Sequence, residues 1–235
     1  EIGKNVNAHI PIVGDVKSVL REFTKEIEAC PCDEWLKKVQ AAKKEAPLRG
    51  EPRTDFVEPR AFMRDLSAMM EDDAILTADV GQNQIWAANN FNTKEGRFLT
   101  SGGMGTMGYA LPAAIGAKLA KPKRQVVAVC GDGSFQMSMC ELATANQNQV
   151  PLKLVVMRNK FLGMVKELQD NLYQGRHVAT PLNGDPDIVK LVQAYGIKAV
   201  FAQNNEDAKK LAKEMLESKE AYVLVCDVDP NTPSI

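Results

Sequence analysis

The sequence predicts an α/β fold, a three-layer sandwich in which helices cover both faces of a mostly parallel sheet. From Pro59 onward, helix-like and strand-like segments alternate along the 235-residue chain. The strand-like segments are nearly continuous apolar runs, such as Gln125-Val126-Val127-Ala128-Val129-Cys130. Continuous apolar strands are typical of a parallel sheet that is buried on both faces.

The first 58 residues predict a separate region. Residues 8–13 predict a short strand, and Asp15 is placed to cap a helix. The apolar residues of that helix share one face: Val16, Val19, Leu20, Phe23 and Ile27. Asp33 is expected to cap a second helix through Lys44. We interpret residues 1–44 as the tail of another domain and the charged, Pro- and Gly-containing residues 45–58 as a linker.

Residues 59–235 form the predicted main domain. Its expected helices cover residues 59–71, 82–92, 107–120, 134–148, 185–195 and 204–218. Its expected strands cover residues 74–79, 125–130, 152–158, 197–201 and 222–227. Parallel sheets bind ligands at the carboxyl ends of their strands, so the loops after residues 79, 130 and 158 are the candidate site.

The composition narrows the function classes. The formal net charge of -1 does not favour nucleic acid or an anionic membrane as a partner. No apolar run is long enough for a spanning helix, and the first residues do not resemble a signal peptide. Five cysteines are too few for a disulfide framework. We expect Cys130, Cys140 and Cys226 to be buried free thiols in the reducing cytoplasm, and Cys30-Pro31-Cys32 to be a loop.

The motif Gly131-Asp132-Gly133 ends one apolar run, and Asn159 follows another, 27 positions after Asp132. A strand, a helix and a second strand fit between them. If the strands are parallel neighbours, Asp132 and Asn159 lie at one sheet edge, where their oxygens would suit a divalent cation. The amides of Gly133 and Ser134, which open a helix, would suit a diphosphate. The alternative without function is an ordinary strand-to-helix turn with Asp132 as its cap.

A second glycine motif allows a different function. Gly103-Met104-Gly105-Thr106-Met107-Gly108 matches the dinucleotide-binding fingerprint, with Asp132 ending the next strand. Residues 97–101, however, are a poor buried strand, and the fingerprint is weak without a clear strand–helix–strand unit. The glycines alone are equally well explained by a tight turn and close helix packing.

The chain resembles the thiamine diphosphate-dependent enzymes, whose motif is Gly-Asp-Gly followed, after a gap, by Asn. Within them it is similar to the C-terminal, diphosphate-binding domain of the acetolactate (acetohydroxyacid) synthase catalytic subunit. Besides Gly131-Asp132-Gly133 and Asn159, four segments carry this resemblance: Asp79-Val80-Gly81-Gln82, residues 101–108, Glu141-Leu142-Ala143-Thr144-Ala145 and Gly163-Met164-Val165. The opening Glu1-Ile2-Gly3-Lys4-Asn5 is similar to the end of that family's central domain, so the resemblance implies that residues 1–44 are the C-terminal tail of that domain.

The resemblance implies a ligand set. Asp132, Asn159 and the carbonyl of Phe161 would bind Mg²⁺. The cofactor would contact Val80, Gly81, Gln82, Gly105, Met107, Gly131, Gly133, Ser134, Met164 and Val165, with Met107 bending it. Met164, Val165 and Leu168 would line the substrate pocket. The implied reaction converts pyruvate to 2-acetolactate and CO2 in a homodimer whose active site lies at the interface, with FAD in the full-length enzyme and scope for a regulatory subunit.

The sequence departs from the family pattern at three places. Arg158 stands where the family has Asn, and Asn83 where it often has His. Leu168 replaces a Trp that favours 2-oxobutanoate as second substrate, so a pyruvate-only enzyme or another thiamine-dependent decarboxylase, oxidase or carboligase is an alternative. The activating Glu belongs to an N-terminal domain of the partner subunit, and no catalytic residue is expected in this chain. We therefore expect a C-terminal fragment that binds Mg²⁺ and diphosphate weakly and is inactive alone.

Overall fold

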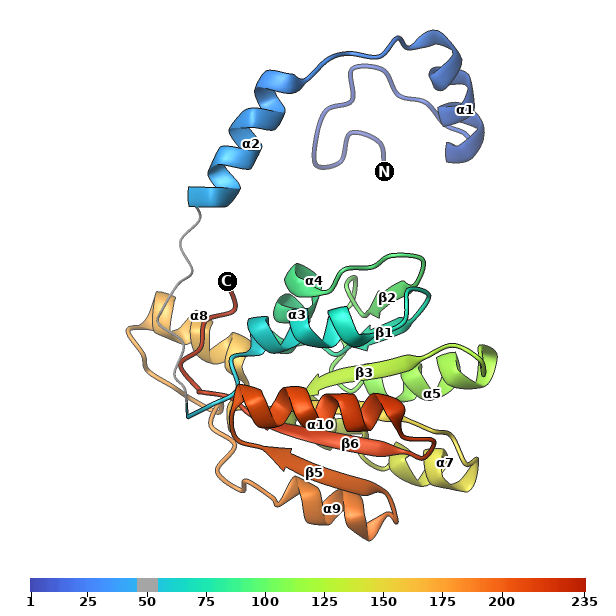
Figure 1. Ribbon diagram of the computed structural model, residues 1–235. Helices are drawn as coiled ribbons and strands as arrows, with labels where there is room; N and C mark the ends of the chain where they lie inside the picture. The colour runs from blue at the N-terminus through green and yellow to red at the C-terminus, as the bar shows by residue number, and fades with distance from the viewer. Residues whose placement is uncertain (46–54) are drawn as a thin grey trace. The chain divides into compact units, whose positions relative to one another are not determined.

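The computed structural model describes residues 1–45 and 55–235 (Figure 1). The chain divides into two units, residues 1–48 and 49–235. The predicted linker, residues 45–58, lies largely outside the described residues. Its last residues join the second unit, where Val57 is buried and donates its N–H to the Asp227 carbonyl at 2.8 Å. The division into tail, linker and cofactor-binding domain stays a prediction.

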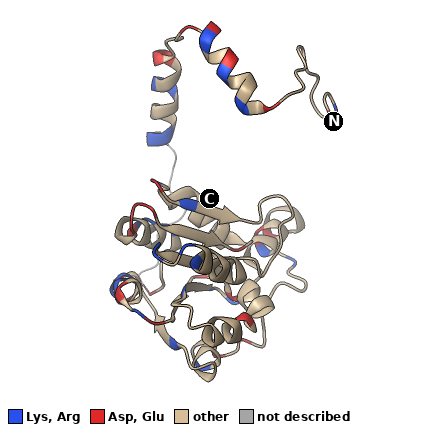
Figure 2. Cartoon of the chain, turned by 90° about the vertical axis from the view of Figure 1, so that its right-hand side faces the viewer, with Lys and Arg blue, Asp and Glu red and all other residues tan. Residues whose placement is uncertain are grey.

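The first unit contains two helices, α1 (Val16–Glu26) and α2 (Asp33–Glu45). The predicted cap of α1 is confirmed, because the Asp15 carboxylate accepts the N–H of Ser18 at 2.9 Å. The helix α2 begins at Asp33 itself, with Leu36 N–H donating to the Cys32 carbonyl, so Asp33 is a first-turn residue and not the cap. Both helices carry charged residues (Figure 2), and in α2 the acidic Asp33 and Glu34 lie in the first turn and the basic Lys43 and Lys44 in the last.

The strand predicted at residues 8–13 is wrong. These residues form bends and irregular backbone and are exposed. A strand needs a neighbouring strand to receive its hydrogen bonds, and the strands that the structure describes all lie within residues 75–227.

The second unit contains a six-stranded, all-parallel sheet, which confirms the predicted α/β fold class. Its strands are β1 (Ile75–Ala78), β2 (Arg97–Thr100), β3 (Val126–Gly131), β4 (Lys153–Arg158), β5 (Lys198–Ala202) and β6 (Tyr222–Asp227). Their order across the sheet is β2-β1-β3-β4-β6-β5. The central strands β3, β4 and β6 are almost wholly buried, as their continuous apolar sequences predict.

Helices cover both faces of this sheet, as Figure 1 shows. The helices of the second unit are α3 (Pro59–Met69), α4 (Gln82–Asn90), α5 (Ala110–Ala120), α6 (Asp132–Ser138), α7 (Glu141–Gln147), α8 (Gly163–Tyr173), α9 (Ile188–Ala194) and α10 (Asn205–Glu217). One core joins α3, α4 and α10 to side chains such as Val127 and Val129 of β3. The other joins α5, α6, α7 and α9 to Ala128 and Cys130 of the same strand. Successive β3 side chains thus enter opposite cores.

Three elements differ from the expectation. Residues 97–101 contain the edge strand β2, whose partial exposure explains their weak apolar pattern. The single helix expected over residues 134–148 is two helices, because Leu142 and Ala143 N–H groups bond three residues back and turn the chain. The helix α8 was not expected; Lys166 is its buried residue, so it lacks the apolar face of a core helix.

The cysteines follow this packing. Cys130 and Cys226 are buried free thiols, as predicted. The expected burial of Cys140 is wrong: it lies at the turn between α6 and α7 and is exposed, as are Cys30 and Cys32. Among the helices of residues 1–45 and 55–235, none is long and apolar enough to cross a membrane.

Candidate functional site

The carboxyl ends of β1, β3 and β4 meet at one edge of the sheet. The strand β3 lies between the other two, and Gly131 is in register with Met157 of β4. The expectation that Asp132 and Asn159 follow neighbouring parallel strands is therefore confirmed. A pocket with about 510 Å³ of open space, solvent at its mouth included, lies at this edge. Its walls are Val80, Gly81, Gln82, Asn83, Trp86, Met107, Gly131, Gly133, Ser134, Met157, Asn159, Phe161, Leu162, Gly163, Met164 and Val165.

Asp132 links the ends of β3 and β4. Its carboxylate accepts the N–H of Gly133 at 3.0 Å and the N–H of Lys160 at 2.7 Å. The residue is only 4% exposed. Burial raises the pKa of this carboxyl to about 6, against the opposing effects of the two N–H donors and the charge of Arg158. Because each carboxylate oxygen has a second lone pair, both can also contact a cation.

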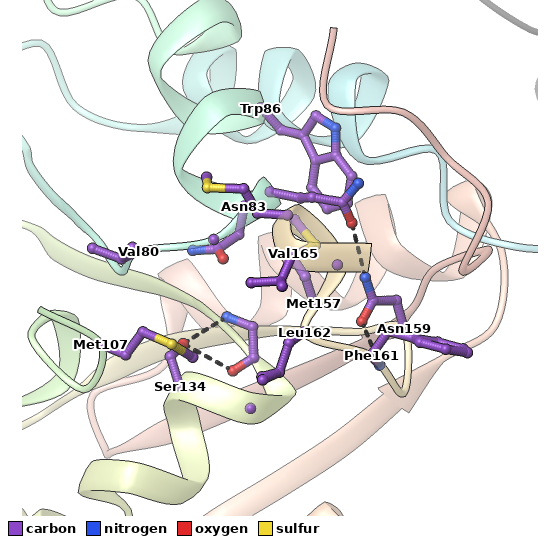
Figure 3. A pocket seen from close by; sticks show the side chains of 16 residues that line it. Val80, Asn83, Trp86, Met107, Ser134, Met157, Asn159, Phe161, Leu162 and Val165 are labelled. Atoms are coloured by element: carbon purple, nitrogen blue, oxygen red, sulfur yellow. Dashed lines mark hydrogen bonds between the residues drawn. The ribbon is translucent and has the colours of Figure 1, made fainter. Parts of the chain in front are cut away.

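Asn159 presents its side-chain oxygen through a second set of contacts. Its Nδ2 donates to Gln82 Oε1 at 3.0 Å, and its Oδ1 accepts the N–H of Phe161 at 3.0 Å (Figure 3). Gln82 Nε2 in turn donates to the Thr232 carbonyl at 3.0 Å and to Glu167 at 3.3 Å. The amide of Asn159 is thus oriented by Gln82, and its oxygen keeps one lone pair for a ligand.

Asp79, to which the sequence assigned no role, organises the pocket wall. Its carboxylate accepts the N–H groups of Val80 and Gly108 at 2.9 Å and of Ala110 at 2.8 Å. These bonds tie the glycine loop that carries Met107 to the end of β1. Burial raises the pKa of Asp79, and the three N–H donors oppose that effect. The available signal was an acidic residue directly after a buried apolar strand.

Two glycines keep the pocket narrow. A Cβ at Gly133 would lie 2.7 Å from Leu162 Cδ2 and 3.8 Å from Met107 Cε. A Cβ at Gly163 would collide with Gln82 Oε1 and lie 2.6 Å from Asn159 Nδ2. Any larger residue would therefore push apart the groups that surround the candidate cation ligands.

The structure brings most of the predicted cofactor residues together. Val80, Met107, Ser134 and Val165 lie around the same pocket in Figure 3, and Met164 is also part of its wall. Gly105 and Leu168 do not line the pocket, and the Leu168 side chain is exposed on α8. Sequence reasoning missed Trp86, Met157 and Leu162. Trp86 lies within α4, Met157 near the carboxyl end of β4 and Leu162 directly before α8. Their contribution depends on how these elements pack together, which no local motif marks. The functional role of each wall residue stays a prediction.

The topology weighs against a dinucleotide site at Gly103, Gly105 and Gly108. A strand, β2, does precede these glycines, but its sheet neighbour is β1 and not β3. The acidic residue Asp132 therefore follows β3, a strand two positions away from β2 across the sheet. The Gly108 N–H is already bonded to Asp79, and the helix α5 starts only at Ala110. The glycine loop serves close packing against α6, since a Cβ at Gly108 would lie 3.3 Å from Met137.

The donor set fits a hard divalent cation held together with a phosphate. Within residues 1–45 and 55–235, no group of three or more His, Cys, Asp or Glu side chains could hold a metal by itself. Asp132 and Asn159 supply two side-chain oxygens. Mg²⁺ prefers oxygen ligands and commonly binds through one or two carboxylates plus substrate phosphates. One carboxylate and one amide at a glycine-lined edge match that preference and leave room for phosphate oxygens.

Comparisons with known proteins agree with this chemistry. Residues 79–226 match the family model described as "Thiamine pyrophosphate enzyme, C-terminal TPP binding domain". The "Probable acetolactate synthase large subunit" of Methanocaldococcus jannaschii is 41% identical over 98% of the chain. The "Acetolactate synthase isozyme 3 large subunit" of Escherichia coli K12 is 38% identical over 92% of it. The chain spans 41% and 39% of the lengths of these two relatives.

Proposed function

The chain belongs to the thiamine pyrophosphate enzyme family, as its C-terminal cofactor-binding domain, and on this premise we propose that the pocket binds thiamine diphosphate together with Mg²⁺. Asp132, Asn159 and the Phe161 carbonyl would hold the cation. Gly131, Gly133 and Ser134 would contact the diphosphate, and Val80, Gly81, Gln82, Gly105 and Met107 the remainder of the cofactor.

The observation that carries this proposal is the state of Asp132. A buried carboxylate is costly unless a positive charge neutralises it. Among the residues that the structure describes, Asp132 accepts only N–H groups and forms no ion pair. The raised pKa, about 6, expresses that cost. A divalent cation at the pocket edge would supply the missing positive charge and would itself be held by the diphosphate.

For the whole protein we propose acetolactate synthase activity, in which two pyruvate molecules give 2-acetolactate and CO2. Bound thiamine diphosphate would supply the nucleophilic carbon that adds to a 2-oxo acid and would stabilise the charge left when CO2 departs. The chain's own contribution is to neutralise the diphosphate, orient the cofactor and exclude water with Met107, Met164 and Val165.

The remaining parts of that activity are proposals about the whole protein. We propose a homodimer with the active site at its interface, an activating Glu from a domain of the partner subunit, and FAD bound largely outside this chain. The departure at Leu168 supports a second candidate, another thiamine-dependent decarboxylase, oxidase or carboligase of 2-oxo acids. Product analysis of the complete enzyme with pyruvate separates the two, because only the first yields acetolactate.

Calorimetry on the 235-residue chain tests the cofactor site. Thiamine diphosphate should bind only with Mg²⁺ present, and Asp132→Ala should abolish that binding. Asp72→Ala is the matched control, because Asp72 is an exposed carboxylate that pairs with Lys94. Binding that persists without Mg²⁺ or in Asp132→Ala would contradict the proposal. Binding of NAD without Mg²⁺ would favour the dinucleotide alternative.

A further inference from the structure

The turn that carries Asn159 is flanked by two cationic residues, and one carboxylate pairs with both. Arg158 donates from Nε to Asp185 Oδ1 at 3.1 Å and from Nη2 to Asp185 Oδ2 at 2.6 Å. Lys160 Nζ lies 3.0 Å from the same Oδ2. Asp185 is 27 positions beyond Arg158 in sequence. Its ion pairs therefore hold the loop between α8 and α9 against the turn that follows β4.

The backbone of the same loop also holds the turn. Leu182 N–H donates to the Lys160 carbonyl at 2.8 Å, and Leu162 N–H donates to the Thr180 carbonyl at 2.9 Å. Phe161 and Pro181 form an antiparallel bridge between these bonds. The predicted cation ligands Asn159 and Phe161 thus lie in a segment that is hydrogen-bonded and ion-paired to residues 180–185.

The conformation of the turn requires such support. Lys160 has φ +62° and Asp185 has φ +29°, both in the left-handed region that costs energy for residues other than Gly. The positive φ at Lys160 accompanies the bond from its N–H to Asp132. The strain persists only if surrounding contacts fix it. The bidentate ion pair between Arg158 and Asp185 belongs to the strongest class of charge-assisted hydrogen bond in proteins, so it can supply that support.

The Arg158–Asp185 ion pair is partly buried and is also connected to the sheet. The side chains of Arg158 and Asp185 are 18% and 31% exposed. Arg158 Nη1 also donates to Asp227 Oδ1 at 2.7 Å, at the end of β6. The Arg158 guanidinium therefore anchors the turn to β6 on one side and to Asp185 on the other. The cationic side chains beside Asn159 are neutralised there, so they leave the pocket free for a bound cation.

We propose that Asp185 is a positioning residue for the cation site: it fixes the 158–161 turn so that the Asn159 and Phe161 oxygens are aimed at the metal. This inference rests on the proposed Mg²⁺–thiamine diphosphate function. Residues that orient metal ligands from outside change metal affinity by about 10- to 100-fold when they are replaced.

The test measures Mn²⁺ affinity by electron paramagnetic resonance, with the 235-residue chain and saturating thiamine diphosphate. Asp185→Asn removes the carboxylate but keeps a residue type that tolerates positive φ. We expect Mn²⁺ to bind about tenfold more weakly. The affinity for thiamine diphosphate at saturating Mn²⁺ should stay unchanged, since the turn is then already set. Damage to the fold as a whole would lower both affinities.

Asp187→Asn is the matched control. Asp187 lies two residues further along, pairs only with Lys190 among the described residues, and caps α9 through an acceptor that Asn retains. It undergoes the same charge change beside the same loop. Mn²⁺ affinity should be unaltered in this variant.

A second variant, Arg158→Gln, separates positioning from long-range charge. Loss of a cation near the site would tighten Mn²⁺ binding if charge alone mattered. Positioning by the pair predicts weaker binding, and no further loss when Asp185→Asn is added. Unchanged Mn²⁺ affinity in Asp185→Asn, or tighter binding in Arg158→Gln, overturns the inference while the proposed function stands. Failure of the unaltered chain to bind Mn²⁺ with thiamine diphosphate overturns both.

Discussion

Replacing Asp132 by Asn is expected to change how the stability of the chain depends on pH. In the folded protein, burial raises the pKa of Asp132 to about 6 from its ordinary value of 3.8. The folded state therefore holds this proton more tightly than the unfolded chain does. The contribution of Asp132 to stability is fully present below pH 3.8 and is lost as the pH rises through about 6.

The magnitude follows from the two pKa values. Their difference corresponds to about 3 kcal/mol, at about 1.36 kcal/mol for each pH unit. About 2 kcal/mol of this falls between about pH 4.5 and about pH 7.5, where measurements are practical. Asn at position 132 keeps one acceptor oxygen but has no charge to bury, so its own contribution does not vary over that range.

The assay is urea unfolding of the unaltered chain and of Asp132→Asn in chelator at a series of pH values. The free energy of unfolding of the unaltered chain minus that of the variant should fall by about 2 kcal/mol as the pH rises from about 4.5 to about 7.5. Other ionisable groups occur in both proteins and largely cancel. A difference that stays constant, or that grows with pH, would refute the account of Asp132. If the account is right, adding Mg²⁺ with thiamine diphosphate in place of chelator should raise the free energy of unfolding at the higher pH in the unaltered chain and not in Asp132→Asn.

Two further substitutions and one labelling experiment test the rest of the site and the core. Asp79→Ala removes the acceptor of three N–H groups and should lower the free energy of unfolding by about 3 kcal/mol in urea titrations. Gly163→Ala places a methyl group between Gln82 and Asn159, and calorimetry should show Mg²⁺-dependent binding of thiamine diphosphate weakened by about tenfold. Iodoacetamide should label the native chain, as read by peptide mass spectrometry, only at Cys30, Cys32 and Cys140, because burial raises the thiol pKa of the other two cysteines.

The Gly163→Ala experiment has a matched control, and the other two predictions each have a result that would contradict them. Gly116→Ala meets no neighbouring atom within 4 Å and should leave cofactor binding unchanged. A loss below about 1 kcal/mol in Asp79→Ala would show that the glycine loop is held by other contacts. Labelling of Cys130 or Cys226 before denaturant is added would contradict their burial.

The sheet could be predicted from sequence because its signals are local. The apolar runs of β3, β4 and β6 reflect burial on both faces, and each strand is a few residues long. The edge strand β2 gave no such signal, since one side of an edge strand faces solvent and Arg97 is exposed. The helix α8 was not predicted from the sequence for a related reason. Its apolar residues Val165, Leu168 and Leu172 are exposed, so it has no apolar face packed in a core to mark it.

The candidate site was predictable where residues adjacent in sequence approach a ligand. Glycines at a strand end and a polar residue after the next strand indicate a site without knowledge of the packing. Residues that act across the fold leave no such pattern. Gln82 orients Asn159 from 77 positions away, and Asp185 reaches Arg158 from 27 positions away.

From the order of its residues alone, the chain was expected to bring Asp132 and Asn159 together at the carboxyl ends of neighbouring parallel strands. Continuous apolar strands, alternating with helices and joined by right-handed connections, leave few other arrangements. The folded chain was needed to see that Asp132 is buried without an ion-pair partner among the described residues, that Asp79 bonds the glycine loop, and that Asp185 pairs with Arg158 and Lys160. Those outcomes depend on side-chain packing between distant segments, where a shift of one ångström makes or breaks a hydrogen bond.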